Sequence, residues 1–382
     1  MTPSLRHCAA FLLCMQFAGV APAAPPALDC AGHPARPRIV GYVAVDGRLP
    51  RISADKLDIV HYAFARLRPD HGVELHKPGA ASALTALVAL RKTNPGLRVV
   101  LSIGGWGADY FSDAALSPES RSRFAESAVG LVRSYDLDGL DIDWEYPAHP
   151  GPGIGFRAED RQNFTAMLRA LRDALDALGA ERGGRRYLLA IAAADGEAAR
   201  GLEIARIAPL LDYVNLMTYD FHGNLSETTG HQAGLFRSRQ APPDSRTAER
   251  AVDEFLRAGM PACKLHLGLA FYGRRFAEVE PARRGLYQRF GSDGGYVSWH
   301  DIRYGLLGKD GWRRHWDRRA QAAWLWNARE RRLVSYDDPR ALRAKARFVR
   351  QRRLGGVMYW EHGQDPDEEL LDVVRKALRV SR

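Results

Sequence analysis

Three acidic residues in the segment DGLDIDWEYP (residues 138–147) have the types and spacing for acid–base chemistry. Side chains alternate between the faces of a β-strand, so Asp141, Asp143 and Glu145 would point the same way, each about 6–7 Å from the next. Three carboxyl groups this close cannot all stay ionised in a poorly solvated site. The group nearest the strand end would therefore keep its proton to unusually high pH, as a general acid must.

Two other interpretations of these acids are less consistent with the pattern. An isolated Asp-x-Asp is typical of a solvated turn, but here Leu140 and Ile142 occupy the opposite face of an otherwise apolar strand. Carboxylates also suit a hard cation such as Mg²⁺ or Ca²⁺. No second acidic cluster supplies the remaining ligands, so we expect neither a metal nor a cofactor.

The elements that must position these acids are predicted from eight short apolar runs, most of them separated by helical patterns. One such helix begins with Ser117 as N-cap and Pro118 in its first turn. Alternating strands and helices predict an α/β fold with parallel strands, and eight strands close a (β/α)8 TIM barrel whose active site lies at their carboxyl ends. The runs are residues 39–43, 57–64, 99–103, 137–142, 187–193, 213–219, 265–272 and 355–360.

About 80 residues separate the seventh and eighth runs, which interrupts the regular alternation. Only residues 338–353 have the pattern of the expected crossover helix. The rest is rich in turns and aromatic residues, and a structureless loop of this length would be unusual. We therefore predict a barrel of residues 38–274 and 335–382, with a small α+β subdomain of residues 275–334 inserted at the carboxyl-end rim.

The first 24 residues have the features of a signal peptide. Arg6 and His7 precede an apolar run over residues 8–20, and small residues follow at 21–23. That run is too short for a membrane anchor, so we expect a secreted or periplasmic protein without a membrane span, joined through a linker of residues 25–37. Cys30 and Cys263 would remain in the mature chain, as a disulfide or as two free or buried thiols.

The composition is that of a globular protein. The chain has 382 residues, of which 46% are hydrophobic and 26% charged, which excludes a disordered or fibrous protein. The formal net charge is +10 and arginine supplies most of the excess. Either a codon preference for arginine or an anionic partner would explain that excess. No segment combines basic and aromatic residues in a nucleic-acid-binding pattern, so we do not expect nucleic acid as a partner.

The acidic segment resembles the DxxDxDxE signature of the family 18 glycoside hydrolases, which are the chitinases and their relatives. The resemblance extends over about residues 38–378, nearly all of the predicted mature chain. Further segments resemble the motifs of the third, sixth and eighth strands and of the chitinase insertion domain. They are SIGGW (102–106), MTYDFHG (217–223), GGVMYWE (355–361), AFYGRRF (270–276), SWHDI (298–302) and LVSYDDP (333–339).

The resemblance implies a role for each acid. Glu145 would protonate the glycosidic oxygen, and the substrate's own 2-acetamido oxygen would attack the anomeric carbon to give an oxazolinium ion, which water opens with retention. Asp143 would orient the acetamido N–H and share a proton with Asp141 or Glu145, while Asp141 buffers that exchange. Tyr219 would donate its hydroxyl to the developing oxazoline oxygen. Asp138 lies off the inward face and would be structural.

The same resemblance implies a set of substrate-binding residues. Trp360 would form the floor beneath the cleaved sugar, Asp220 would hold sugar hydroxyls, and Met217 would point inward beside Tyr219. Further cleft residues would be the aromatic Tyr42, Phe64, Trp106 and Tyr272, together with Arg274.

These inferences predict a secreted, monomeric chitinase whose partner is chitin or a chitooligosaccharide. Other polymers that carry the 2-acetamido group remain open as substrates, namely peptidoglycan, an N-glycan core or a lipochitooligosaccharide. A lectin that binds sugar without cutting it is a further alternative. The presence of an acid at Glu145 argues against the lectin.

Overall fold

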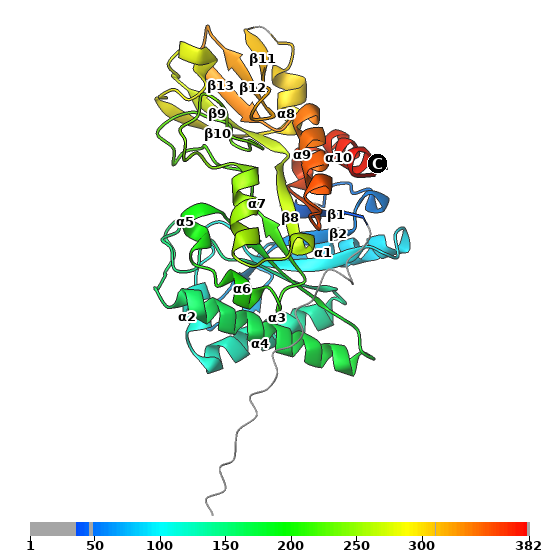
Figure 1. Cartoon of the computed structure of the whole chain (residues 1–382). Coiled ribbons are helices and arrows are strands. Elements are labelled where there is room, and N and C mark those ends of the chain that lie inside the picture. Colours follow the sequence, from blue (N-terminus) through cyan, green and yellow to red (C-terminus); the bar gives the residue numbers. More distant parts are fainter. Residues whose placement is uncertain (1–35, 46–48, 310, 380–382) are drawn as a thin grey trace, which may run out of the picture.

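Eight parallel strands form a closed barrel in the computed structural model, which describes residues 36–45, 49–309 and 311–379 (Figure 1). Their spatial order follows the chain, and the last strand pairs with both the first and the seventh, which closes the barrel. The predicted (β/α)8 TIM barrel is therefore confirmed. Its strands are β1 (Arg38–Ala44), β2 (Ile59–Leu67), β4 (Arg98–Gly104), β5 (Gly139–Asp143), β6 (Leu188–Ala193), β7 (Tyr213–Leu216), β8 (Leu265–Ala270) and β14 (Gly356–Trp360). The short β3 (Val73–Glu74) pairs antiparallel with β2.

Helices cover the outside of the barrel. α3 (Pro118–Ser134) begins where the sequence predicts, because the Ser117 hydroxyl accepts a hydrogen bond from the Ser120 N–H and Pro118 follows it. α4 (Asp160–Glu181) buries one apolar face. The other helices are α1 (Ala80–Ala89), α2 (Phe111–Leu116), α5 (Gly196–Ala199), α6 (Ile204–Ile207), α7 (Ala248–Arg257), α9 (Pro339–Gln351) and α10 (Glu369–Arg379), with short 3₁₀ or π turns at Ala54–Lys56, Leu90–Lys92, Ala262–Lys264, Ala282–Gly285, Ile302–Leu306 and His362–Gln364.

A second sheet stands at the end of the barrel toward which β8 points (Figure 1). It is antiparallel, with the strand order β10-β9-β13-β12-β11. One face encloses a small aromatic core that includes Phe276, Trp324 and Trp326, and the other face joins the main core through Leu325 and Tyr336. Its elements are β9 (Tyr272–Ala277), β10 (Ser292–Ser298), the short α8 (Trp299–Asp301), β11 (Trp312–Asp317), β12 (Ala322–Asn327) and β13 (Arg332–Tyr336).

Several sequence predictions concern the chain ends and cysteines. The predicted signal peptide and Cys30 lie outside the described residues. Cys263 takes part in a disulfide. Among the residues that the structure describes, no helix combines the length and apolar character needed to cross a membrane.

The barrel interior differs chemically from the layer between strands and helices. That outer layer is apolar and contains Leu140 and Ile142 of β5. The interior combines apolar residues such as Val40 and Met358 with fully buried polar ones, including Asp141 and His266. Because each buried polar group needs a partner, the interior side chains must be arranged as a hydrogen-bonded set.

Candidate active site

Asp141 lies at the centre of the barrel interior and is fully buried. Its Oδ2 accepts hydrogen bonds from the Tyr42 hydroxyl at 2.8 Å and from the Ser102 hydroxyl at 2.6 Å. The His61 Nδ1 lies 3.3 Å from the same oxygen. Three neighbouring strands therefore hold this carboxyl group in one orientation.

A larger buried network continues from these partners of Asp141. The Asn215 amide donates to the Tyr42 hydroxyl at 2.9 Å, and its carbonyl lies 3.1 Å from the His266 Nδ1. On the other side, the His61 Nε2 lies 2.7 Å from the Tyr213 hydroxyl. The Tyr213 ring stacks on His266 at 4.7 Å between centroids, which completes a ring of polar side chains around the barrel interior.

Asp143 is the last residue of β5 and is almost completely buried. Burial, together with the negative charges of Glu145 and Asp141, raises its pKa well above the usual value. Two glycines at the end of β4 make its position possible. A Cβ on Gly104 would lie 2.1 Å from the Asp143 carbonyl oxygen, and one on Gly105, whose φ is +87°, would collide with the Phe64 ring. The glycines of SIGGW therefore let β4 approach both residues.

Glu145 follows β5 by two residues and is partly exposed. Burial and the charge of Asp220 raise its pKa, whereas a hydrogen bond with Tyr146 and the charge of Arg66 lower it, and the net result is a pKa of about 7. A carboxyl group with this pKa holds its proton near neutral pH and can still give it up.

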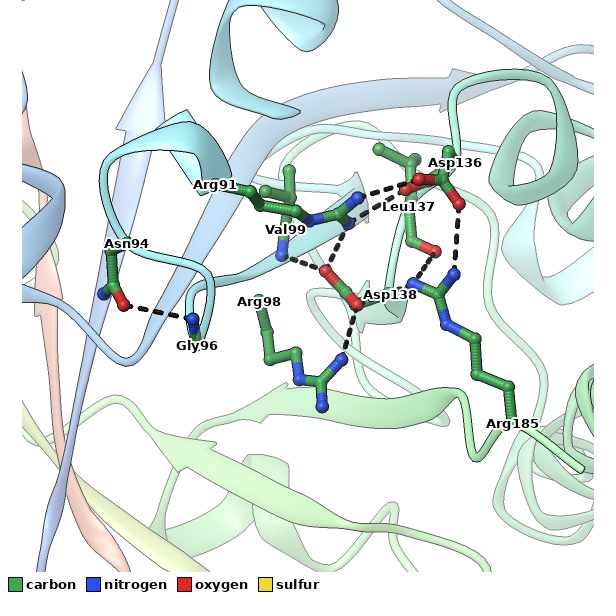
Figure 2. A network of polar contacts seen from close by, with 9 residues as sticks. All are labelled: Arg91, Asn94, Gly96, Arg98, Val99, Asp136, Leu137, Asp138 and Arg185. Atoms are coloured by element: carbon green, nitrogen blue, oxygen red, sulfur yellow. Dashed lines mark hydrogen bonds and ion pairs between the residues drawn. The ribbon is translucent and has the colours of Figure 1, made fainter. Parts of the chain in front are cut away.

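Asp138, the first acid of the segment, lies at the opposite, amino end of the strands. It accepts a hydrogen bond from the Val99 N–H at 2.7 Å and ion pairs from Arg98 at 3.0 Å, Arg185 at 2.8 Å and Arg91 (Figure 2). Burial alone would raise the pKa of Asp138, but the Val99 N–H and the arginines hold it below its usual value. Asp138 thus lies apart from the other three acids.

The segment after β7 brings Tyr219 and Met217 to the inner cluster of the barrel. The Tyr219 hydroxyl donates to the Met358 sulfur at 3.7 Å, which is a weak acceptor. Its ring meets Tyr272 edge-on at 6.0 Å. Burial, with the charges of Asp143 and Asp220, raises the pKa of Tyr219 well above its usual value, so the hydroxyl remains a neutral donor.

Aromatic residues gather where β14 and β2 end. Trp360 stacks on Phe64 with ring centroids 5.5 Å apart and packs against Tyr42 at 5.7 Å. Trp106 makes no such contact with them; its side chain is about half exposed and lies 6.3 Å from the Tyr146 ring. The structure therefore brings three of the predicted cleft aromatics together and leaves Trp106 apart from them, next to Tyr146.

The second sheet contributes Arg274 of β9. Its Nε donates to an Asp220 carboxylate oxygen at 2.8 Å, and its Nη2 donates to the Tyr296 hydroxyl at 2.7 Å. The guanidinium also lies over the Tyr296 ring, 3.8 Å from the centroid. This contact joins the second sheet to the segment after β7, beside Tyr272.

The sequence profile of the Glycosyl hydrolases family 18 matches residues 38–365, most of the chain. The chain belongs to this family. Chitinase A1 of Niallia circulans is 37% identical over 314 residues, which are 78% of this chain and 45% of that protein. Chitinase B of Serratia marcescens is 30% identical over 347 residues, 75% of this chain and 68% of that protein. This family 18 chain therefore spans less than half the length of the first of these relatives.

Among solved structures, a family 18 N-acetylglucosaminidase from Paenibacillus barengoltzii is 38% identical, with a TM-score of 0.84. The match covers 89% of this chain and 99% of that one. The structural likeness to this relative thus extends over most of the family 18 chain.

Chemically, the family 18 site offers one carboxyl group that can give up a proton near neutral pH and a second, buried one beside it. Within the described part of the chain, no group of three or more His, Cys, Asp or Glu side chains is arranged to hold a metal ion. The arrangement is suited to proton transfer onto a leaving oxygen beside aromatic side chains.

Several residues of this family 18 site were not predicted from the sequence. His61, Ser102 and Asn215 lie on barrel strands with inward parity, so strand alternation could have indicated their direction but not their partners. Tyr146 follows directly after Glu145, and Tyr296 comes from the second sheet, whose position relative to the barrel no local pattern indicates.

Proposed function

We propose that this family 18 protein hydrolyses the β-1,4 bonds between N-acetylglucosamine residues in chitin or chitooligosaccharides. The observation that carries the proposal is Glu145, a carboxyl group whose pKa is raised to about 7 at the carboxyl end of the barrel. The named activities of the relatives, two chitinases and an N-acetylglucosaminidase, support the same substrate chemistry.

The proposed reaction is retaining and assisted by the substrate. Glu145 gives its proton to the glycosidic oxygen as the bond to the anomeric carbon breaks, and the substrate's acetamido oxygen forms a new bond to that carbon. The resulting oxazolinium ion is opened by water, which returns a proton to Glu145. Since this nucleophile belongs to the bound sugar, its entropy is lost on binding rather than in the chemical step.

Asp143 and Asp141 serve this step in the proposal. Asp143, whose raised pKa favours a bound proton, orients the acetamido N–H and shares that proton with Glu145 or Asp141. Asp141, which accepts hydrogen bonds from the Tyr42 and Ser102 hydroxyls, buffers that exchange in the proposal.

The remaining predicted residues bind the sugar in this proposal. Tyr219 turns its hydroxyl from the weak sulfur acceptor to the oxazoline oxygen. Trp360 supplies the apolar floor, and Asp220 accepts from sugar hydroxyls. Further contacts come from Tyr42, Phe64, Trp106, Met217, Tyr272 and Arg274.

Two further parts of the proposal concern the chain as a whole. Residues 275–334 act as an inserted subdomain that forms one wall of the cleft. The separate aromatic core of the second sheet supports the view that these residues fold as a unit. Residues 1–24 direct secretion, which the basic and apolar pattern of the sequence supports.

Glu145→Gln tests the function directly. We expect turnover of chitotetraose to fall by at least about a hundredfold, the scale of general acid catalysis, while binding is kept. The matched control is Glu197→Gln, because the Glu197 side chain is 77% exposed and lies on the short α5. A Glu145→Gln protein that cuts chitotetraose at the wild-type rate would overturn the proposal.

The products distinguish the alternatives. Release of reducing ends from chitotetraose but not from purified peptidoglycan supports chitin-like chains, and the reverse indicates a wall hydrolase. Binding without hydrolysis by the wild-type protein would indicate a lectin. An oligomer with glucosamine at the reacting subsite lacks the acetamido nucleophile, so steady cleavage there would refute the substrate-assisted route.

A further inference from the structure

The net positive charge of this chain is confined to one segment. Of 55 basic and 45 acidic residues, 14 basic and four acidic ones lie between residues 311 and 353, so the rest of the sequence is formally neutral. A codon preference for arginine over lysine would not concentrate net charge in this way. The segment therefore needs a structural or functional explanation.

The strongest concentration lies on α9. From residue 339 to residue 353 there are six arginines and one lysine but no acidic residue. Arg340, Arg343, Arg347 and Arg350 recur at intervals of three and four, which places them on one face of the helix, whereas Lys345 is buried on the other side. Like charges at this spacing destabilise a helix. We call these four residues the α9 arginine face.

An open cavity of about 260 Å³ is lined by residues of the first turns of this face, of the second sheet and of α10. Figure 1 shows α9 next to α10. Two of its arginines are already paired with acids: Arg314 with Asp338 and Arg303 with Glu369 at 3.2 Å. Each of these pairs is neutral, so the net charge of the cavity depends on its other arginines.

Arg340 and Arg343 also line the cavity, and neither forms an ion pair with a described residue. The Arg340 guanidinium lies over the Trp316 ring at 4.2 Å, which occupies its face and leaves its N–H edge available. The cavity thus presents the N–H donors of two guanidinium groups that have no acidic partner among the described residues.

We propose that the α9 arginine face and its cavity bind an acidic polysaccharide, at a site separate from the barrel mouth. Guanidinium groups bind carboxylate and phosphate groups through paired N–H donors. One helical turn rises about 5.4 Å, close to the length of one sugar residue in an extended chain, so successive arginines match successive anionic sugars. A polymer bound on this flank leaves the carboxyl ends of the strands free.

The test measures binding of the full chain to polygalacturonate, which carries carboxylates, and to a phosphomannan, which carries phosphodiesters. We expect Arg340→Gln/Arg343→Gln/Arg347→Gln to weaken binding at low salt by at least about tenfold and to reduce the slope of log Kd against log salt by about two to three. The relative affinity for the two polymers identifies the preferred anionic group.

The matched control replaces three exposed arginines from the neutral part of the chain, Arg169, Arg182 and Arg239, with glutamine. It should bind as the wild type does, and both triple variants should hydrolyse chitotetraose at the wild-type rate. The proposal would be overturned if the α9 variant bound the polymers as tightly as the wild type does, or if the control variant lost as much affinity. Duplex DNA that bound more tightly than the polymers, and depended equally on these arginines, would also overturn it. Binding is measured without turnover, so these outcomes are independent of the proposed hydrolase activity.

Discussion

Burial and the negative charge of Asp220 together hold the proton on Glu145. Since the protonated form is the active one, kcat should be highest below pH 7 and fall about tenfold per pH unit above it. Asp220→Asn removes a charge that raises this pKa, so the alkaline limb of kcat should move to lower pH. A pH–rate profile on a soluble chitooligosaccharide measures both effects, and an unchanged limb in the variant would contradict this account.

The same carboxyl group links pH to stability. Its pKa rises from 4.5 in the unfolded chain to about 7 when folded, so its contribution to stability is present below pH 4.5 and is lost as the pH rises through 7. The difference corresponds to about 3 kcal/mol. The free energy of unfolding of Glu145→Gln, relative to that of the wild type, should therefore be about that much higher at pH 8 than at pH 4.5. Denaturant titrations at both pH values measure it, and exposed Glu197→Gln should show no such change.

At the scale of single elements, the amino ends of β4 and β5 depend on the buried carboxylate of Asp138. Asp138→Asn should lower the free energy of unfolding by about 2 kcal/mol, because three arginines and the Val99 N–H lose an ionised acceptor. The loss should grow smaller as the pH falls through the lowered pKa of Asp138, where the wild-type carboxyl group is also protonated.

Asp136→Asn is the matched control for that prediction. Asp136 pairs with two of the same arginines, Arg91 and Arg185, but its side chain is 68% exposed, so its loss should cost less than about 1 kcal/mol. Neither variant should change KM, since both residues lie at the end of the barrel away from Glu145. Equal destabilisation by the two changes would show that burial is not what gives Asp138 its effect.

The sequence predicts elements better than the contacts between them. Apolar runs located all eight barrel strands, and strand parity placed Asp141 and Asp143 inward and Leu140 and Ile142 outward. Parity also places His61 and Asn215 inward, but their hydrogen-bond partners come from strands more than 50 residues away in the chain. Such contacts depend on how the barrel closes, which no local pattern specifies.

At the scale of the whole molecule, a buried ion pair lies where the chain passes between the barrel and the second sheet. The Lys345 Nζ donates to Asp337 at 2.6 Å, and the same carboxylate accepts from the Ala270 N–H at the end of β8. Lys345→Met should cost about 3–5 kcal/mol, because it leaves a buried carboxylate without its cation.

Lys345→Met/Asp337→Asn is the matched control for the charge. Burial raises the pKa of Asp337 even with Lys345 beside it, so removing both charges should restore part of the lost stability. Chemical denaturation of the two variants gives the comparison. A double variant as unstable as the single one would mean that Lys345 acts through packing and not through its charge.

The second sheet also shows where prediction from sequence ends. Its aromatic composition indicated a folded insertion, but the strand order β10-β9-β13-β12-β11 does not follow the chain. That order places Arg274 beside Asp220, 54 residues earlier. Only long-range packing brings these two residues together.

The contact between Arg274 and Asp220 gives the second sheet an electrostatic influence on the chemistry below it. Asp220 raises the pKa of Glu145, and the only cation bonded to Asp220 among the described side chains comes from β9. In a shortened chain without this sheet, no cation would balance the charge of Asp220. The pKa of Glu145 would then be higher even if the barrel still folded. Proton donation at the mouth is thus tuned partly by a structure that never touches the acid.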